Sequence, residues 1–351
     1  MKTINDLKEM FTHLNDSGEM PIPRMIMLET RSRCNGLCSF CPANALVDNR
    51  GDTLMEDDLF AKIINDLAEM DYPNRLSLYN NNEPFLDKRI FKFISQARES
   101  LPKAYIELKS NGTVVTKEKV LKAFNSGLDM LYINDYNDIP KHNTSVIKLK
   151  EELSGIRRFG VNGLNNNDFH RIEITLRDRG AIMGSRGGKS PNKKEPVNPY
   201  KNSMCLRPCE MMTISPNGKV SICCEDFDWS LAFLNVKDRS LSEIWSSNEW
   251  REIRRKLLKG EREWHKSCES CDMHGYSLEM LSEYNIKRNQ LDPKLIIRRI
   301  YQKITKGLNV MKFKIKAKVS SKSKKEIRKE ELALIAAARK KSALLAQSKK
   351  S

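Results

Sequence analysis

The chain has 351 residues, of which 39% are hydrophobic, enough for one large domain and a smaller one with buried cores. It contains no run of about 18 apolar residues, so no membrane-spanning helix is predicted. The first six residues, Met1 to Asp6, lack the apolar segment of a signal peptide. We therefore expect a cytoplasmic protein whose nine cysteines are reduced thiols, available to metal and not paired as disulfides.

The net charge of +17 is concentrated at one end of the chain. Residues 294–351 hold 19 Lys and Arg against three Glu, so residues 1–293 hold 43 basic and 42 acidic side chains. This distribution argues against a zinc-bearing nucleic-acid-binding protein, whose folded body would carry the basic charge, and we expect no specific nucleic-acid partner. Within 295–304, apolar residues alternate with Arg298, Arg299 and Lys303, as in a cationic helix that binds an anionic membrane surface peripherally or docks on an acidic partner. After Ser320 a solvated, disordered tail is the alternative.

Strands and helices alternate through the first half of the chain. The apolar run 25–29 predicts a first buried strand, and the capping-box spacing from Thr53 to Glu56 predicts a helix that ends near Met70. Further strands are expected at 75–79, 105–109, 130–134 and 172–176, with helices at 88–98 and at 116–126 before Gly127. This alternation predicts an α/β fold with a parallel sheet, whose chemistry lies at the carboxyl ends of the strands.

The pattern changes in the second half. Residues 135–170 show no clear pattern, and residues 177–204 are polar and rich in Gly, Pro and Asn, which indicates a loop. Strands at 211–215 and 219–223 flank Pro216-Asn217-Gly218, a strong hairpin signal. A helix is expected over 241–258, ended by Gly260.

Three cysteines lie within eight residues, at Cys34, Cys38 and Cys41, and Phe40 directly precedes the third. So short a loop can wrap three sulfurs around one metal centre and leaves one coordination position without a local ligand. In an iron–sulfur cluster, which is normally held by four cysteines, this leaves one iron open to another molecule. The alternative is zinc, but zinc ligands usually come as a C-x2-4-C pair with a second pair farther along the chain.

A second set consists of Cys205, Cys223, Cys268 and Cys271. The predicted hairpin and helix would bring these four sulfurs together in a closed site, for which spacing alone allows structural zinc equally well. Two cysteines, Cys209 and Cys224, are left over. Because Cys224 adjoins Cys223 on a strand, its side chain would point the other way, and we interpret it as a buried thiol.

The C-x3-C-x2-C loop with its aromatic residue resembles the signature of the radical S-adenosylmethionine (SAM) enzymes, whose open iron is chelated by SAM. The C-x12-G-x4-C piece from Cys205 to Cys223 resembles the auxiliary-cluster domain called SPASM. No cysteine follows Cys271, which favours the shortened, single-cluster form known as twitch. The resemblance implies a partial (β/α) barrel of five to six parallel strands in residues 1–180. It further implies a linker loop at 181–204, the twitch/SPASM domain with one auxiliary 4Fe-4S cluster at 205–275, and a basic helical or disordered tail at 276–351.

The resemblance also implies SAM-binding residues. Asn81-Asn82-Glu83-Pro84 follows the second strand, in the place of the Gly-Gly-Glu-Pro motif that receives the α-amino group of SAM. An ordinary Asn-rich turn is the alternative, and Asn adopts positive φ less readily than Gly. Ser110 and Asn111, at the end of the third strand, correspond to the segment that meets the ribose or carboxylate of SAM. Asn134, after the fourth strand, is a weaker candidate for contact with SAM. Phe40 corresponds to the aromatic residue whose backbone meets the adenine.

The auxiliary spacing and Ser185-Arg186-Gly187-Gly188 resemble the aminocyclitol dehydrogenases of this family. The resemblance implies reductive cleavage of SAM to a 5′-deoxyadenosyl radical, which removes hydrogen from a secondary alcohol of a sugar or cyclitol. The auxiliary cluster would accept the second electron, and a flavodoxin- or ferredoxin-like protein would supply electrons. The pKa of arginine is above about 12, so Arg186 would orient the hydroxyl and not act as a base. The alternative within the family is a peptide- or protein-modifying enzyme, sulfatase-maturase-like or thioether-forming.

Overall fold

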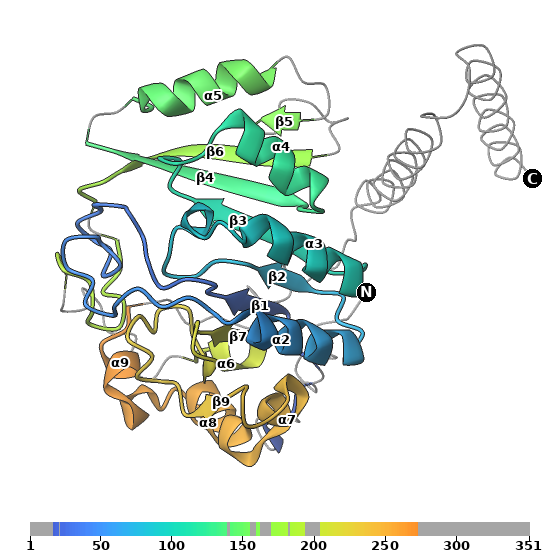
Figure 1. Cartoon of the computed structure of the whole chain (residues 1–351). Helices are drawn as coiled ribbons and strands as arrows, with labels where there is room; N and C mark the ends of the chain where they lie inside the picture. Colours follow the sequence, from blue (N-terminus) through green and yellow to red (C-terminus); the bar gives the residue numbers. More distant parts are fainter. Residues whose placement is uncertain are drawn as a thin grey trace, which may run out of the picture. The chain divides into compact units, whose positions relative to one another are not determined.

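The computed structural model describes residues 17–20, 22–138, 141–154, 159–161, 170–181, 183–193 and 204–272 (Figure 1). These residues belong to one compact unit, Met1–Gln290. The basic tail at 276–351 lies outside the described residues, so the predictions made for it are untouched. No helix in the described part is long and apolar enough to cross a membrane.

One nine-stranded sheet organises the described residues, in the order β5-β6-β4-β3-β2-β1-β7-β8-β9. All pairings among β1 to β6 are parallel, as the strand–helix alternation predicted. The strands are β1 Met25–Leu28, β2 Arg75–Ser77, β3 Tyr105–Ser110, β4 Met130–Asn137, β5 Phe159–Val161, β6 His170–Asp178, β7 Met211–Ile214, β8 Lys219–Ser221 and β9 Leu234–Asn235.

Helices cover one face of the parallel strands and leave the other face for the site (Figure 1). They are α2 Asp57–Glu69, α3 Ile90–Ser100, α4 Lys117–Asn125 and α5 Thr144–Ser154. Because side chains alternate along a strand, Ile26 and Leu76 belong to the large core with these helices. Met27 and Tyr79 point the other way and pack with Met211 in a separate small cluster.

Two predicted helix boundaries are wrong. The capping box at Thr53 is absent: α2 begins after Glu56, which makes no side-chain cap, and Thr53 instead pairs with Ser32. The helix predicted over 241–258 is two helices, α7 Leu241–Ser246 and α8 Asn248–Leu258. They divide at Ser247, which has extended backbone and accepts a hydrogen bond from Trp250 N as the cap of α8.

The stretch 135–170, where no element was assigned, contains α5 and β5, and β4 and β6 run farther than predicted. The loop predicted from residue 177 therefore begins only after Asp178. The hairpin is confirmed, with β7 and β8 antiparallel and Gly218 at a φ of 82° in the turn.

The second part of the chain, residues 204–272, continues the same sheet. β7 pairs in parallel with β1, with Met25 opposite Met211 and Leu28 opposite Ile214. Short helices follow at α6 Arg207–Glu210, η2 Arg262–Trp264 and α9 Lys266–Glu269. The sheet thus runs across the domain boundaries placed near 180 and 204, and these boundaries stay predictions.

Candidate active site

A cavity of about 550 Å³ opens on the face of the sheet away from α2 to α5. In Figure 1 the loop that follows β1 and the loop that follows β6 lie side by side at the carboxyl ends of the parallel strands. Nearly all the site residues predicted from the first half and from the Arg186 loop line this cavity: Cys34, Cys38, Phe40, Cys41, Asn81, Asn82, Glu83, Ser110, Asn111, Asn134 and Arg186. Pro84 is the exception, because it begins the short helix η1, Pro84–Leu86, behind the cavity wall.

The first three cysteines lie close enough to raise one another's pKa. Burial, the largest cause, raises the pKa of Cys34 to about 11 and that of Cys38 to about 12, and the neighbouring thiols add to it. Cys34 Sγ accepts a hydrogen bond from Gly36 N at 3.3 Å and lies 3.7 Å from Asn111 Nδ2. Such thiols need the positive charge of a metal centre to become thiolates.

Within the described ranges, no three His, Cys, Asp or Glu side chains lie close enough together to hold a single metal ion. Cys34, Cys38 and Cys41 instead surround one part of an open cavity. Three thiols beside an open space fit a cluster with one exchangeable position.

Glu83 joins the ends of β2 and β3. Its carboxylate accepts hydrogen bonds from Ser110 Oγ at 2.8 Å, Asn111 N at 2.7 Å and Phe85 N at 3.2 Å. The residue is 1% exposed, and burial raises its pKa to about 7 against the effect of these donors. A buried carboxylate that lines the cavity fits the ammonium group of an amino-acid ligand such as SAM.

The turn before Glu83 offers donors to a ligand. The side-chain Nδ2 atoms of Asn80, Asn81 and Asn82 are buried and have no hydrogen-bond partner among the described residues. Unsatisfied buried amides are costly, so their presence at the cavity wall fits a ligand that brings acceptors, as the carboxylate of SAM would. Among the described non-glycine residues only Asp71, Arg186 and Trp229 have positive φ, so the turn does not need the glycines of the family motif.

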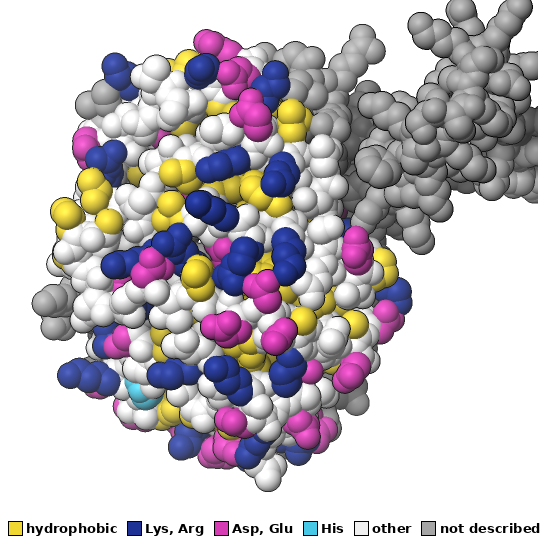
Figure 2. Space-filling view, in the orientation of Figure 1, with side chains coloured by type: hydrophobic (Ala, Val, Ile, Leu, Met, Phe, Trp, Pro, Cys, Tyr) yellow, Lys and Arg dark blue, Asp and Glu magenta, His cyan; other side chains and the backbone are white. Residues whose placement is uncertain are grey.

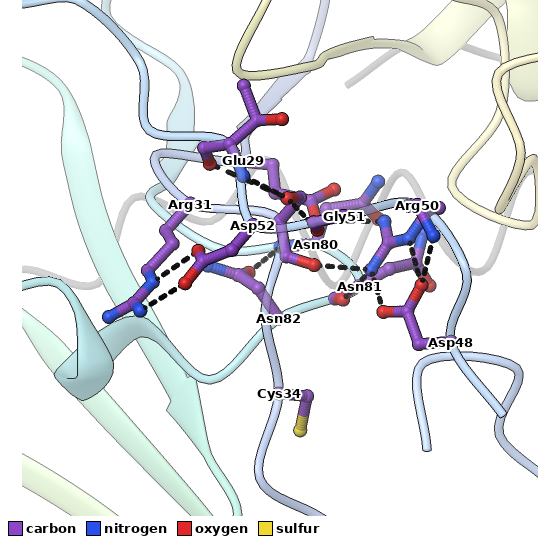
Figure 3. A network of polar contacts seen from close by, with 12 residues as sticks. Glu29, Arg31, Cys34, Asp48, Arg50, Gly51, Asp52, Asn80, Asn81 and Asn82 are labelled. Atoms are coloured by element: carbon purple, nitrogen blue, oxygen red, sulfur yellow. Dashed lines mark hydrogen bonds and ion pairs between the residues drawn. The ribbon is translucent and has the colours of Figure 1, made fainter. Parts of the chain in front are cut away.

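Arg50 lies at the centre of a network of ion pairs and hydrogen bonds that joins segments on either side of the cysteine loop (Figure 3). It forms ion pairs with Glu29 at 3.0 Å and Asp48 at 2.9 Å, and it donates to the carbonyl of Asn81 at 2.9 Å. Its guanidinium also lies 4.1 Å from the ring centroid of Phe227, in the second part of the chain. Glu29 is fully buried, and its pKa is raised by that burial to about 7 although Arg50 opposes the rise. Asp48 is two positions from Arg50, but Glu29 and Asn81 are 21 and 31 positions away, so the cluster forms no local motif and the sequence analysis missed it.

The loop that carries Arg186 lies between the two cysteine sets. Ser185 Oγ donates to Ser270 O at 2.6 Å, and Ser190 Oγ donates to Phe40 O at 3.0 Å. Arg186 has a φ of 53°, a left-handed conformation that costs a non-glycine residue about 1–3 kcal/mol, so the surrounding contacts must impose it. A side chain at Gly187 would come within 2.9 Å of Ser267 O, which explains the glycine.

Arg186 is held in place by two oxygens. Its Nη1 pairs with Glu225 at 2.9 Å, its Nη2 donates to Asn81 Oδ1, and its Nε has no partner among the described residues. Burial opposes the charge of Arg186, but Glu225 and the nearby cysteines raise its pKa above the ordinary value. The guanidinium therefore stays charged and keeps one donor free.

The four predicted auxiliary cysteines also come together. Cys205, Cys223, Cys268 and Cys271 line a second cavity of about 30 Å³, together with Ile222, Leu231 and Leu257. Burial raises the pKa of Cys268 to about 12, and the charges of Cys205 and Cys271 contribute. Four thiols around a small, largely apolar space fit a closed cluster site.

The two remaining cysteines differ. Cys209 is 2% exposed within α6, and burial raises its pKa to about 12, as expected of a core thiol. Cys224 lines the large cavity and Cys223 the small one, but both follow the end of β8 and their thiols hydrogen-bond to each other, which raises the pKa of Cys223 and lowers that of Cys224. The prediction that the two side chains point in opposite directions is therefore wrong. Cys224 is also only half-buried, so its interpretation as a buried core thiol is wrong.

Comparisons with known proteins agree with both cysteine sets. Residues 205–272 match the SPASM family, an iron-sulfur cluster-binding domain. The S-adenosyl-L-methionine-dependent 2-deoxy-scyllo-inosamine dehydrogenase of Niallia circulans, an oxidoreductase, is 24% identical over 260 residues, covering 74% of this chain and 97% of that protein. A tungsten-containing aldehyde ferredoxin oxidoreductase cofactor-modifying protein of Pyrococcus furiosus is 28% identical over 134 residues, 38% of this chain and 36% of its own length.

Solved structures support the same fold. The crystal structure of BtrN in complex with AdoMet and 2-DOIA has a TM-score of 0.60 at 22% identity, covering 73% of this chain and 95% of that one. BtrN in an open conformation has a TM-score of 0.52 at 19% identity, covering 72% and 93%. The chain therefore has the fold of BtrN and carries a SPASM iron–sulfur domain, which confirms the resemblance to radical SAM enzymes that its two cysteine sets predicted.

Proposed function

We propose that the chain is a radical SAM dehydrogenase that oxidises a secondary alcohol of a sugar-like or cyclitol substrate to a ketone. The observation that carries this proposal is the place of Arg186, which lines the large cavity with the first cysteines and is anchored beside the second set. The dehydrogenase relative, matched over 97% of its length, supports the reaction class.

The chain's own residues have distinct roles in this proposal. Cys34, Cys38 and Cys41 hold a 4Fe-4S cluster with an open position, and Cys205, Cys223, Cys268 and Cys271 hold one auxiliary cluster, as in the twitch form. When bound, SAM and the first cluster would supply the one-electron chemistry that removes a hydrogen atom from the substrate, and the auxiliary cluster would take up the second electron that leaves the substrate. A flavodoxin- or ferredoxin-like partner would supply the electron that reduces the first cluster. Glu83 and the Asn80–82 amides hold SAM by its ammonium and carboxylate.

Arg186 and Glu225 act on the substrate hydroxyl. Oxidation of an alcohol to a ketone removes two electrons and two protons, one of them with the hydrogen atom from carbon. The guanidinium of Arg186, which lines the cavity, can donate to the hydroxyl oxygen, and Glu225, which lines the same cavity and lies 2.9 Å from Nη1, can accept the hydroxyl proton.

The test supplies polyols that carry deuterium at the carbinol carbon to the reconstituted full-length enzyme. We expect deuterium in 5′-deoxyadenosine together with one equivalent of ketone. Deuterium from a peptide Cα or Cβ, with none from any polyol, would move the chain to the peptide-modifying alternative.

Variants separate the steps. Arg186→Lys keeps the charge but loses the planar fork, so ketone formation should fall about a hundredfold while SAM cleavage persists. The matched control Arg239→Lys changes a pair that is 45% and 47% exposed and should leave both rates unchanged. Replacing Cys268 and Cys271 by Ala should leave 5′-deoxyadenosine formation partly intact and uncouple it from ketone formation. Loss of both products in step would contradict a separate role for the auxiliary site.

We further propose that the protein is cytoplasmic and that residues 294–351 form a surface-binding arm. On the face shown in Figure 2, Lys and Arg side chains of the described residues alternate with Asp and Glu, so the body offers no single-sign surface there. Each basic residue near an anionic bilayer contributes about 1 kcal/mol. Deleting 294–351 should abolish salt-sensitive binding to anionic vesicles and spare SAM cleavage, and equal vesicle binding without the tail would contradict this proposal.

A further inference from the structure

The large cavity contains a group of cations away from the cysteine loop. Arg75 on β2, Lys109 on β3 and Arg177 on β6 line it together with the site residues described above. Lys109 Nζ lies 5.5 Å from the ring centroid of Tyr79 and 5.6 Å from that of Tyr132, both of which line the same face of the sheet. The three cations therefore come from β2, from its neighbour β3 and from β6, which β4 separates from β3, and they line one shared cavity.

The carboxylates in and beside the cavity leave two of these cations uncompensated. Arg75 is neutralised by Glu107, whose Oε2 is 2.6 Å away. Glu225 is paired with Arg186, and Glu83 is engaged by Ser110 and Asn111.

In the part of the chain that the structure describes, the side chains of Lys109 and Arg177 form no ion pair. Burial lowers the pKa of Lys109, and the charges of Arg75 and Arg177 lower it further, against the opposing effects of Glu107 and Cys224. Among the described residues, no carboxylate of the cavity is thus paired with either of these two cations.

We infer that the substrate carries an anionic oxygen group, a phosphate or a carboxylate, which Lys109 and Arg177 bind while a hydroxyl faces Arg186. This inference rests on the proposed function, because it names the class of alcohol that is oxidised. Arg presents a planar fork of donors and Lys a compact charge, and both recognise phosphate and carboxylate oxygens. Lys109 is half-buried and Arg177 is exposed, so a bound anion would offset the cost of partly burying the unpaired charge of Lys109 and would also meet the charge of Arg177.

The same argument separates this chain from its curated relative. That relative is named for an inosamine, which carries an ammonium group at neutral pH. An ammonium placed near Lys109 and Arg177 would meet two like charges, whereas a sugar phosphate or a sugar acid would meet two opposite ones. The two proteins thus share a fold and differ in the charge of the substrate that the cavity favours.

Binding to the full-length holoenzyme tests the inference without requiring turnover. Equilibrium dialysis, with both clusters and SAM present, compares glucose 6-phosphate, glucuronate, glucose and glucosamine, with inorganic phosphate as competitor. We expect at least one of the two anionic sugars to bind about tenfold or more tightly than glucose, and glucosamine to bind no better than glucose. The order of glucose 6-phosphate and glucuronate tells whether phosphate or carboxylate is the source of the anionic group, and inorganic phosphate should displace the tighter one.

Lys109→Met should remove about tenfold or more of the preference for the anionic sugar and leave glucose and SAM binding unchanged. Arg177→Met should act in the same direction. The control Lys148→Met alters a side chain that is 75% exposed on α5 and should change nothing.

Several results would overturn the inference. These are equal binding of all four sugars, absence of binding by any of them, tightest binding of glucosamine, or a loss of SAM affinity in Lys109→Met, which would assign Lys109 to the SAM site. If an anionic sugar binds as expected but no deuterated alcohol of any charge transfers its label, the proposed oxidation is wrong while the anion site stands.

Discussion

The two cysteine sites differ in where their ligands come from and in what surrounds them. The first takes three thiols from one loop, Cys34 to Cys41, and faces a cavity of about 550 Å³ with many polar side chains. The second takes four thiols from segments spread between residues 205 and 271 and encloses about 30 Å³ beside Ile222, Leu231 and Leu257. An open site can exchange a ligand and a closed one cannot, and this difference is why we propose the reaction at the first site and uptake of the second electron at the other.

The buried arginines Arg50 and Arg254 also differ in the groups that surround them. Arg50, behind the first site, is compensated by two carboxylates, Glu29 and Asp48. Arg254, in the second part of the chain, is fully buried and donates hydrogen bonds to backbone carbonyls, those of Pro208, Gly18 and Trp245 at 2.8–3.0 Å. It also lies 4.0 Å from the ring centroid of Trp245, and its burial lowers its pKa to about 10. Arg50 is thus held by carboxylate charges, and Arg254 by backbone carbonyls and an aromatic ring.

The largest expected effect comes from removing either cysteine set. The reconstituted protein should bind about eight Fe, and replacing Cys34, Cys38 and Cys41 by Ala should leave about four and abolish SAM cleavage. Replacing the four auxiliary cysteines should also leave about four Fe but retain SAM cleavage. Iron analysis and 5′-deoxyadenosine assays measure both. Stoichiometric zinc without iron would remove the distinction between the sites.

The second-largest expected effect is a loss of stability when Arg50 or Arg254 is replaced. Arg50→Met leaves two buried carboxylates without their cation and should lower the free energy of unfolding by about 3–5 kcal/mol. Arg254→Met leaves carbonyls without a donor and should cost about 1–3 kcal/mol. Urea unfolding of both variants at one pH measures the difference.

The loss of stability in Arg50→Met should also depend on pH. The raised pKa of Glu29 means that the folded state binds its proton between pH 4.5 and about 7, so this group lowers stability as pH rises through that window. Without Arg50 the pKa of Glu29 rises further. The decrease in the free energy of unfolding caused by Arg50→Met should therefore be larger at pH 8 than at pH 6. An equal decrease in both arginine variants at both pH values would show that charge does not distinguish their surroundings.

The smallest effect concerns Glu83, a buried carboxylate at the open site. Its pKa is raised to about 7, and only the ionised carboxylate can hold the ammonium of SAM. SAM binding should weaken by up to about tenfold for each pH unit below 7. Glu83→Gln should bind SAM weakly with no such slope. Equilibrium dialysis from pH 6 to pH 8 measures this, and an unchanged slope in Glu83→Gln would assign the titration to another group.

The difference between a site built from one loop and a site built from distant segments also explains how much the sequence could predict. Three cysteines in one loop and the parallel strands around them are local patterns, and the structure brings them together as expected. The four distant cysteines needed the resemblance to a known domain in addition to their spacing. The Arg50 cluster and the cations Lys109 and Arg177 carry no sequence signal, because their meaning depends on which strands are neighbours. The break at Ser247 was missed because one capping serine outweighed a continuous helical pattern.

The parallel pairing of β7 with β1 has a consequence for how the molecule can be divided. In the intact chain β1 lies between β2 and β7, so its backbone groups are paired on both sides. A protein shortened to its first 204 residues would leave Met25–Leu28 as an exposed, apolar edge strand, and such edges recruit strands from other molecules. The first part of the chain is therefore not a module that can be separated from the second, and a truncated protein would aggregate before its chemistry could be assayed.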